Sequence, residues 1–304
     1  MILICGIPTE TPVALLIQQL ENNKLPYLLF NQRDFISTNM VYKIVNGKIQ
    51  GTIRLNDSTV DLNKITGVYN RLINFMSIPE YEDTKDEAVR HHCAKLHDTI
   101  NQWLEVTDAK VVNKNSSMIS NMSKPFQTQL ISDFDLDIPE TIITNQPEEV
   151  VSFLKEKERV IYKSASGVRS IVQELTEEDI PKLKKICWCP TQFQEYVEGN
   201  NIRVHVLGDQ VFSTLIKSSA TDYRYDSDTE YIPVNLPDTI NRACIALTKS
   251  LDMCFSGVDL KYDESKDRYT CFEVNPSPAY SHYEKHSGQK ISHALANYLL
   301  GNVA

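Results

Sequence analysis

The sequence lacks any apolar run long enough to cross a membrane. The longest apolar stretches, such as residues 13–20 (VALLIQQL), fall well short of the ~20 residues that a membrane span needs. No basic stretch followed by an apolar segment and a cleavage site marks a signal peptide. We therefore expect a cytoplasmic protein that has no membrane as a partner.

Cysteine is present, but not in a pattern typical of metal binding or disulfides. The chain has seven cysteines, an odd number, and Cys187 and Cys189 in CWC are too close for the usual zinc pairing. Reduced, partly buried thiols are expected in a cytoplasmic protein. No cysteine chemistry is predicted.

An excess of positive charge is also missing. The net charge is -9, and nucleic-acid binding draws its affinity from clustered Lys and Arg, so no nucleic-acid partner is expected. A small anionic ligand held by a few placed cations stays compatible with this charge. With 41% hydrophobic and 23% charged residues in 304, the composition is that of a globular protein with two or three subdomains.

The predicted elements form three consecutive blocks. Residues 1–112 begin with a strand, a helix and a second strand, continue with a hairpin around Asn46-Gly47, and end with a long helix over residues 83–105. This pattern predicts a small α/β domain.

The other two blocks mix helices and strands. In residues 113–197 we expect helices at 125–134 and 145–156, the second capped by Asn145 with Glu148 reaching back, and strands at 160–164, 170–175 and 191–197. Residues 198–304 alternate as strands, with helices at 239–251 and 291–300. The fold class is therefore α/β (α+β), with domains 1–112, 113–197 and 198–304.

The stretch CFEVNPSPAYSHYE places two oxygen-bearing side chains in an extended apolar run. Glu273 and Asn275 are two residues apart and so share one face of a strand. Pro276 and Pro278 end the strand there, at the position where α/β enzymes place their ligands. The pair could grip a cation, or it could belong to the solvated face of an edge strand.

A third oxygen ligand lies one strand earlier. Asp259 in GVDLKYD is separated from Glu273 by the polar turn DESKD, so the two strands can pair antiparallel and bring Asp259 beside Glu273 and Asn275. Three oxygen ligands without sulfur or imidazole suit magnesium, which often shares its shell with nucleotide phosphates.

Two lysines fit a bound nucleotide. Lys163 ends a buried strand just before the small-residue loop SASGVRS, and Lys124 stands at a helix start, where a cation and backbone donors favour phosphate.

The order of these residues resembles an ATP-grasp ligase across about residues 113–301. The resemblance implies ATP and Mg2+ as cofactors and a pre-ATP-grasp α/β domain before residue 113. It also implies a role for each matched position: ATP contacts at Lys124 and Lys163, a hinge facing adenine at Gln194, Glu195, Tyr196 and Val197, a catalytic Arg203, and metal ligands at Asp259, Glu273 and Asn275.

More closely, the chain is similar to the RimK-like branch, which contains the ribosomal-protein glutamate ligases and the graspetide (microviridin-type) peptide synthetases. The carrying segments are IRVHVLGDQVFSTLIKSSATDYRYD, LPDTI, GVDLKYD, FEVNPSPAY and SGQKISHALANYLL. This resemblance implies that Lys217 meets phosphates, and that Asp222 and Arg224 in DYR meet the substrate.

The chain departs from the family pattern at two places. The loop after Lys163 has only Gly167 and adds Arg169, and NPSPAY replaces the more usual residues after Asn275. The acceptor need not be that of any known member.

The resemblance implies an ATP-dependent carboxylate-amine or carboxylate-hydroxyl ligase that acts through an acyl phosphate. The substrate would be a peptide, protein or amino acid with a free carboxylate, and the chain could act as a homodimer. Two alternatives stay open: a ligase of small amino acids or dipeptides, and an inactive nucleotide-binding protein. Arg71, which ends a strand toward the expected cleft, is a further candidate for substrate contact, whereas His91, His92 and His97 are expected on a helix without a metal.

Overall fold

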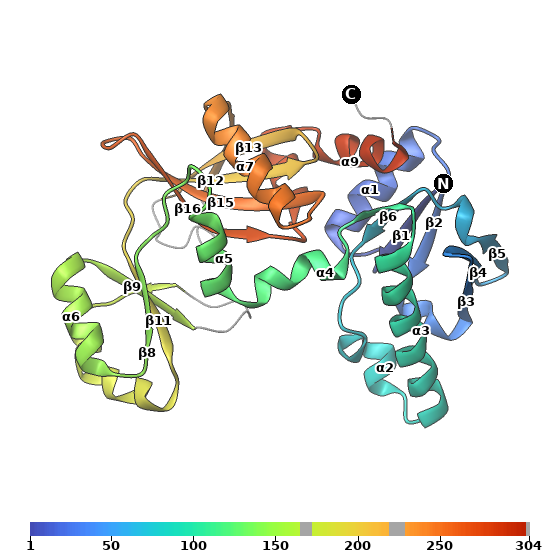
Figure 1. Cartoon of the computed structure of the whole chain (residues 1–304), viewed down its shortest axis with the longest axis horizontal. Coiled ribbons are helices and arrows are strands. Elements are labelled where there is room, and N and C mark those ends of the chain that lie inside the picture. The colour runs from blue at the N-terminus through green and yellow to red at the C-terminus, as the bar shows by residue number, and fades with distance from the viewer. Residues whose placement is uncertain (165–171, 219–228, 302–304) are drawn as a thin grey trace.

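The computed structural model describes residues 1–164, 172–218 and 229–301. These residues build three lobes in chain order: a first lobe, a central lobe and a C-terminal lobe (Figure 1). The predicted α/β (α+β) class is observed. The domain bounds at residues 112 and 197 stay a prediction, although each predicted block builds at least one sheet of its own.

The first lobe holds a parallel sheet and a small antiparallel sheet. Its elements are β1 (Ile2–Gly6), α1 (Thr11–Asn22), β2 (Tyr27–Asn31), η1 (Gln32–Ser37), β3 (Thr38–Val45), β4 (Lys48–Leu55), β5 (Ser58–Asp61), η2 (Leu62–Lys64), β6 (Gly67–Asn70), η3 (Phe75–Ser77), α2 (Pro79–Asp83), α3 (Glu87–Val106) and β7 (Lys110–Val112).

The parallel sheet has the order β2-β1-β6-β7 and is covered on both faces. Leu3 and Cys5 of β1 pack with α3, while Ile2 and Ile4 pack with α1 and with α9 (Ile291–Leu300) from the far end of the chain. The alternating strand residues therefore feed two separate cores. Because α9 supplies one of them, the last helix joins the first lobe to the C-terminal lobe (Figure 1).

The predicted hairpin is present in the small sheet β3-β4-β5. Val45 pairs with Lys48, and the two residues between them, Asn46 and Gly47, have φ of 51° and 76°. Positive φ at both positions is what a type I′ turn requires, and Asn-Gly provides it with little strain.

The linking segment and the central lobe come next. Their elements are α4 (Asn115–Met118), η4 (Ile119–Met122), α5 (Lys124–Ile131), β8 (Thr141–Thr144), α6 (Pro147–Lys157), β9 (Val160–Ser164), β10 (Gln173–Glu174), η5 (Glu177–Trp188) and β11 (Thr191–Glu195). The central sheet has the order β10-β9-β11-β8, and α6 and η5 cover one of its faces.

The predicted cap of α6 is wrong. The N-cap residue is Gln146 rather than Asn145, and no side chain caps the helix. Pro147 occupies the first helical turn and holds the residue before it in an extended conformation, so the helix begins later than the Asn-x-x-Glu pattern indicated.

The C-terminal lobe is built on a five-stranded antiparallel sheet with the order β14-β13-β12-β15-β16. Its elements are β12 (Asn200–Leu207), β13 (Gln210–Lys217), β14 (Glu230–Val234), α7 (Asp238–Ser250), β15 (Phe255–Asp263), β16 (Arg268–Asn275), α8 (Tyr280–Ser287) and α9. Strand β14 and helix α8 were not predicted. The last helix matches its predicted range.

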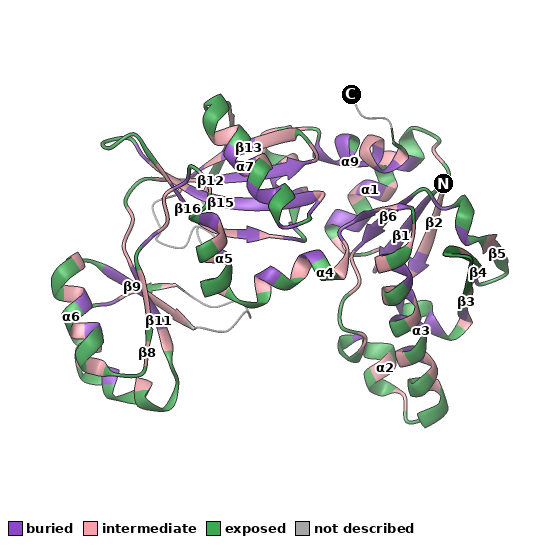
Figure 2. Cartoon of the chain, in the orientation of Figure 1, coloured by how far each residue is buried: buried purple, intermediate pink, exposed green. Residues whose placement is uncertain are grey.

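The two faces of this sheet differ. One face packs under α5 and α7 through Val204, Val258 and Val274, each fully buried. On the other face Tyr283 of α8 lies against His205, with 4.9 Å between the ring centroids. Figure 2 shows the resulting pattern, in which the strands of the lobe are largely buried and the outer sides of the helices are exposed. Arg203, Asp259, Glu273 and Asn275 lie on the face that carries His205.

Candidate active site

The three predicted oxygen ligands meet on the two adjacent strands β15 and β16. Asp259 pairs directly with Glu273 and Gly257 with Asn275, while a bulge after Asp259 leaves Phe272 without a direct partner. The Asn275 side-chain nitrogen donates to Asp259 Oδ2 at 3.0 Å and to Glu273 Oε1 at 3.3 Å. Strand alternation and the polar turn, both read from the sequence, therefore bring these residues together.

The donor set of this cluster fits magnesium. It offers two carboxylates and one carboxamide, all oxygen donors of the kind that Mg2+ prefers. The amide of Asn275 presents nitrogen to the carboxylates here, so a half-turn of its side chain would bring Oδ1 toward a cation; which amide atom points inward is assigned from hydrogen bonding. Within the described residues, no group of three or more His, Cys, Asp or Glu side chains could hold a metal ion, so the cluster depends on Asn275 for its third ligand.

Each of the two carboxylates in the cluster forms an ion pair with a basic side chain. Lys124 Nζ lies 2.6 Å from Glu273 Oε2, and an Arg203 guanidinium nitrogen lies 2.5 Å from Asp259 Oδ1. Both cations have little exposed area, 18% for the Lys124 side chain and 8% for Arg203. Two positive and two negative groups thus share one partly buried face.

The carboxylates respond differently to this environment. Burial opposes ionisation of Glu273, but Lys124 and then Lys163 outweigh it and lower the pKa of Glu273 to about 2. For Asp259, burial and the neighbouring Glu273 raise the pKa above its ordinary value against the opposing effect of Arg203. Neighbouring carboxylates that titrate apart are what close like charges produce.

Gly257 makes room for Arg203. A Cβ at position 257 would lie 2.2 Å from a guanidinium nitrogen, because the arginine lies directly over this glycine on the neighbouring strand. No role was predicted for this glycine, although its position two residues before Asp259 puts it on the same face.

Lys163 brings the central sheet toward this cluster. It pairs with Gln192 across β9 and β11, and its charge reaches Glu273. Gln192 and Gln194 share its face of the sheet by alternation and are each only 3% exposed. Their Oε1 atoms have no hydrogen-bond partner among the described residues, and buried polar atoms of this kind call for one.

Two backbone N–H groups of the hinge, residues 194–197 (QEYV), donate to neighbouring segments. The Glu195 N–H donates to Glu140 O at 3.0 Å and the Tyr196 N–H to Arg159 O at 2.9 Å. Among the described residues, no backbone acceptor bonds the Val197 N–H. The hinge role itself stays a prediction.

The other predicted site residues are not gathered at the cluster. Lys217 is exposed and ends β13; since Thr214 pairs with Arg203, strand alternation places Lys217 on the opposite face. Its phosphate contact stays a prediction. Asp222 and Arg224 lie outside the described residues.

Sequence reasoning missed Gln127, which holds strand β16. Its side chain is buried and donates to Val274 O at 2.8 Å, and the Val274 N–H donates back to its Oε1 at 2.9 Å. Position 127 lies one helical turn after Lys124, so α5 presents both residues to β16. That spacing was the available signal.

Asn113 and Arg71 connect the first lobe to the loop after Asn275. Asn113 Nδ2 donates to Phe255 O at 2.6 Å and to Pro276 O at 2.5 Å. Arg71 donates to Ser277 O at 2.9 Å and forms an ion pair with Glu10. Arg71, considered above for substrate contact, thus joins the first lobe to the C-terminal lobe. The loop that follows Asn275 is held by both lobes.

Other polar groups take structural places. All seven cysteines are free thiols, as predicted, and burial raises the pKa of Cys244 to about 12. His97 is buried, its Nε2 lies 2.9 Å from Gln32 Nε2 and its Nδ1 lies 2.8 Å from Cys93 O.

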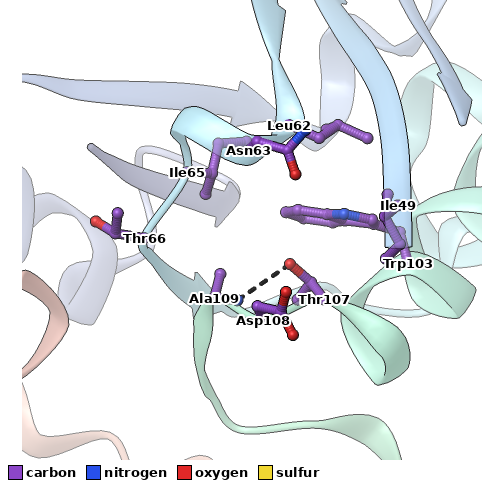
Figure 3. A pocket seen from close by; sticks show the side chains of 9 residues that line it. All are labelled: Ile49, Leu62, Asn63, Ile65, Thr66, Trp103, Thr107, Asp108 and Ala109. Carbon is purple, nitrogen blue, oxygen red and sulfur yellow. Dashed lines mark hydrogen bonds between the residues drawn. The ribbon is translucent and has the colours of Figure 1, made fainter. Parts of the chain in front are cut away.

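A cavity of about 220 Å3 lies in the first lobe, away from the cluster. Figure 3 shows the Trp103 indole between Leu62 and Asn63 on one side and Thr107 and Asp108 on the other. None of its lining residues belongs to the candidate site.

Among the described helices, none has the length and apolar character needed to span a membrane.

Solved structures with this fold cover nearly the whole chain. The macrocyclase MdnC from Microcystis aeruginosa MRC, bound with its precursor peptide MdnA, is 22% identical with a TM-score of 0.80 over 99% of each chain. A RiPP-associated ATP-grasp ligase from Chryseobacterium gregarium, in complex with ADP and a leader and core peptide, is 22% identical with a TM-score of 0.85 over 100% of this chain and 97% of its own. The ATP-grasp ligase PsnB, complexed with a precursor variant, Mg and ADP, is 22% identical with a TM-score of 0.78 over 99% and 98%.

Sequence comparison reaches the family level. A search of curated proteins gives no match. The family model for the RimK-like ATP-grasp domain matches residues 121–299, more than half of the chain and all of the described cluster. The chain therefore belongs to the RimK-like ATP-grasp family, which confirms the fold, the family and the class of ATP-dependent ligase predicted from its sequence.

Proposed function

We propose that the protein joins a carboxylate of a peptide to an amine or hydroxyl group, with ATP and Mg2+ as cofactors and through an acyl phosphate. The observation that carries this proposal is the convergence of Asp259, Glu273 and Asn275 with Lys124 and Arg203 on one sheet face. A peptide substrate is supported by structural neighbours with precursor peptides bound, which align over nearly the full chain.

The first step would transfer the γ-phosphoryl group. A carboxylate oxygen of the substrate attacks the γ-phosphorus, the bond to the β-phosphate oxygen breaks, and ADP leaves. Lys124, Lys163 and Arg203 would offset the charge on the phosphate oxygens, with Lys217 as a further predicted contact. Bound by Asp259, Glu273 and Asn275, magnesium would neutralise phosphate charge.

The second step would form the product bond. The amine or hydroxyl attacks the acyl carbon, gives up one proton, and inorganic phosphate leaves. The resulting amide or ester has lost one water relative to the starting groups. No side-chain nucleophile is needed, so the chain's own residues position the reactants and balance charge.

Adenine would lie between the central and C-terminal sheets. The Val197 N–H would donate to an adenine acceptor, and Gln192 and Gln194 lie on the same sheet face as Lys163. The side-chain oxygens of the two glutamines are suited to accept from the exocyclic amine of adenine or from a ribose hydroxyl.

Arg224 and Asp222 are proposed to hold the substrate, on the family resemblance alone. A guanidinium can bind a carboxylate through two parallel hydrogen bonds, which lysine cannot reproduce. We expect Arg224→Lys to keep ATP affinity and to lower ligation at least about tenfold, or about 1.4 kcal/mol in transition-state stabilisation.

Cytoplasmic location, a homodimer and the absence of nucleic-acid and membrane partners complete the proposal. The acidic net charge of -9 supports the absence of a nucleic-acid partner. A gel-filtration run with light scattering would decide between monomer and homodimer.

The test is ligation of a peptide encoded beside the gene for this chain. With ATP and magnesium, we expect ADP release together with a peptide whose mass has fallen by one water for each bond formed. ADP release with free amino acids and none with peptides would favour the small-molecule ligase. ATP binding without ADP release from either substrate class would overturn the proposed activity.

A further inference from the structure

Lys261 stands between the metal cluster and the hinge. It lies two residues after Asp259 on β15, so both side chains leave the same face of the strand about 7 Å apart. On the neighbouring strand Lys261 pairs with Asn201, just as Asp259 pairs with Arg203. This lysine therefore occupies the nucleotide side of the sheet, one step toward the adenine end.

Its ammonium group reaches across to the hinge. Lys261 Nζ donates to Val197 O at 2.7 Å and lies 4.9 Å from the centroid of the Tyr196 ring. The Arg159 guanidinium lies 3.6 Å from the same centroid. In the hinge, Val197 therefore accepts a charged hydrogen bond and the Tyr196 ring lies near two cations.

A second contact docks the same hinge on the same strand. Gly199 has φ of +116°, and a Cβ there would lie 2.2 Å from Tyr262 O. The backbone after the hinge therefore lies directly against β15, which only glycine permits at this distance and φ. Val197 and Gly199 contact the consecutive residues Lys261 and Tyr262.

We propose that Lys261 is a positioning residue that fixes the adenine-binding hinge to the strand carrying the metal ligand Asp259. This inference rests on the proposed function and deepens it. The hinge docks on β15 through Lys261, and β15 also carries Asp259. The distance between the adenine contacts and the phosphate contacts is therefore fixed, so that one ATP molecule can reach both. Lys261 acts on the nucleoside end alone.

The experiment compares two ligands that differ only in the nucleoside. Calorimetry with magnesium measures the dissociation constants of ATP and of inorganic tripolyphosphate for the wild type, Lys261→Met and Lys261→Arg. Lys266→Met is the matched control, because Lys266 is exposed in the turn of the same hairpin. ADP release is measured in parallel to separate KM from kcat.

For Lys261→Met we expect the dissociation constant and KM of ATP to rise about tenfold, or about 1.4 kcal/mol, while tripolyphosphate binding and kcat stay at wild-type values. Lys261→Arg should restore most of the loss, because a guanidinium can also donate to a carbonyl. Lys266→Met should bind both ligands as the wild type does. Lys261→Gln, whose neutral side chain is one atom shorter, replaces Lys261→Met if that variant does not fold, with the same selective loss expected.

Two results would overturn the inference. Equal losses for ATP and tripolyphosphate would place Lys261 at the phosphates, and an unchanged ATP constant would leave the lysine without a positioning role. A wild type that binds tripolyphosphate and ATP with equal affinity would also overturn it, since no nucleoside contact would exist. Failure of the proposed function is distinguishable, because the wild type would then release no ADP with any acceptor, whereas the outcomes for Lys261 are decided by the dissociation constants of ATP and tripolyphosphate.

Discussion

The two faces of the C-terminal sheet differ in the residues that they carry: the candidate site residues lie on one face and the buried core residues on the other. On one face the side chains are apolar and fully buried; on the other, charged groups pair with one another. The two sets come from the same three strands: Val204, Val258 and Val274 against Arg203, Asp259 and Glu273. Strand alternation alone separates them. Substitution of the charged residues should therefore mainly change activity, and substitution of the valines should mainly change stability.

The largest effect is expected from Glu273→Gln on the charged face. The change keeps shape but removes the charge that would bind magnesium and that now pairs with Lys124. ADP release should be abolished, a loss of at least about a hundredfold or about 2.7 kcal/mol, with the fold intact. Glu264→Gln, in the exposed turn of the same hairpin, is the control. Magnesium-dependent turnover at the wild-type rate in Glu273→Gln would sink the metal assignment.

On the apolar face, Val258→Ala should produce the opposite result. Val258 is fully buried next to Asp259, so its truncation leaves a cavity and lowers the free energy of unfolding by about 2 to 3 kcal/mol. ATP affinity of the folded protein should not change. Val41→Ala, a valine that is 67% exposed on β3, should stay within about 0.5 kcal/mol of the wild type. Loss of ATP affinity without loss of stability in Val258→Ala would show that the two faces are not independent.

A smaller effect is expected from Gln127→Ala, because Gln127 bonds the backbone of the edge strand β16. The side chain satisfies both backbone groups of Val274, and removing it leaves a buried N–H and C=O without their partner at a cost of about 2 kcal/mol. Because Val274 lies between Glu273 and Asn275, ATP affinity should fall as well, though less than in Glu273→Gln. The exposed Gln129 on the same helix supplies the control, Gln129→Ala. Urea unfolding measures the free energy of unfolding, and calorimetry measures ATP affinity. Wild-type values of both in Gln127→Ala would show that the hydrogen bonds of Gln127 to Val274 do not support the strand.

The effect of His205 is the smallest near neutral pH and grows as the pH falls. Burial first, and then Arg203, hold the pKa of His205 well below its ordinary value. The unfolded chain therefore takes up a proton that the folded protein does not, so stability is full above about pH 6.5 and falls at lower pH by up to about 1.4 kcal/mol per unit. His205→Phe should have a flatter profile between pH 4 and 6.5. Identical slopes for the two proteins would show that this buried histidine does not contribute.

The sequence predicted what depends on local pattern. Asn46-Gly47 specifies its turn through backbone preference, and the alternation around Glu273 and Asn275 follows from strand geometry. The ordered lysines, hinge and oxygen ligands indicated the family, which the model match confirms.

What was missed depends on contacts between distant segments. The roles of Gln127 and Gly257 arise only when α5 meets β16 and Arg203 lies over β15, and Lys261 gains its role only when the hinge docks beside it. The wrong cap at Asn145 has a local cause, since Pro147 sets where α6 begins. The spacing of Lys124 and Gln127 places them on one helix face, but it does not identify β16 as the strand that they contact.

The most direct test of a nucleotide site on the charged face is a thermal melt with ATP and magnesium, alone and together. At a hundredfold excess of ATP over its dissociation constant, magnesium present, the wild type should gain about 2.7 kcal/mol of stability. Glu273→Gln should gain much less, because it lacks a ligand charge for the metal. A wild-type melt that ATP and magnesium leave unmoved, or an equal shift in both proteins, would contradict the account.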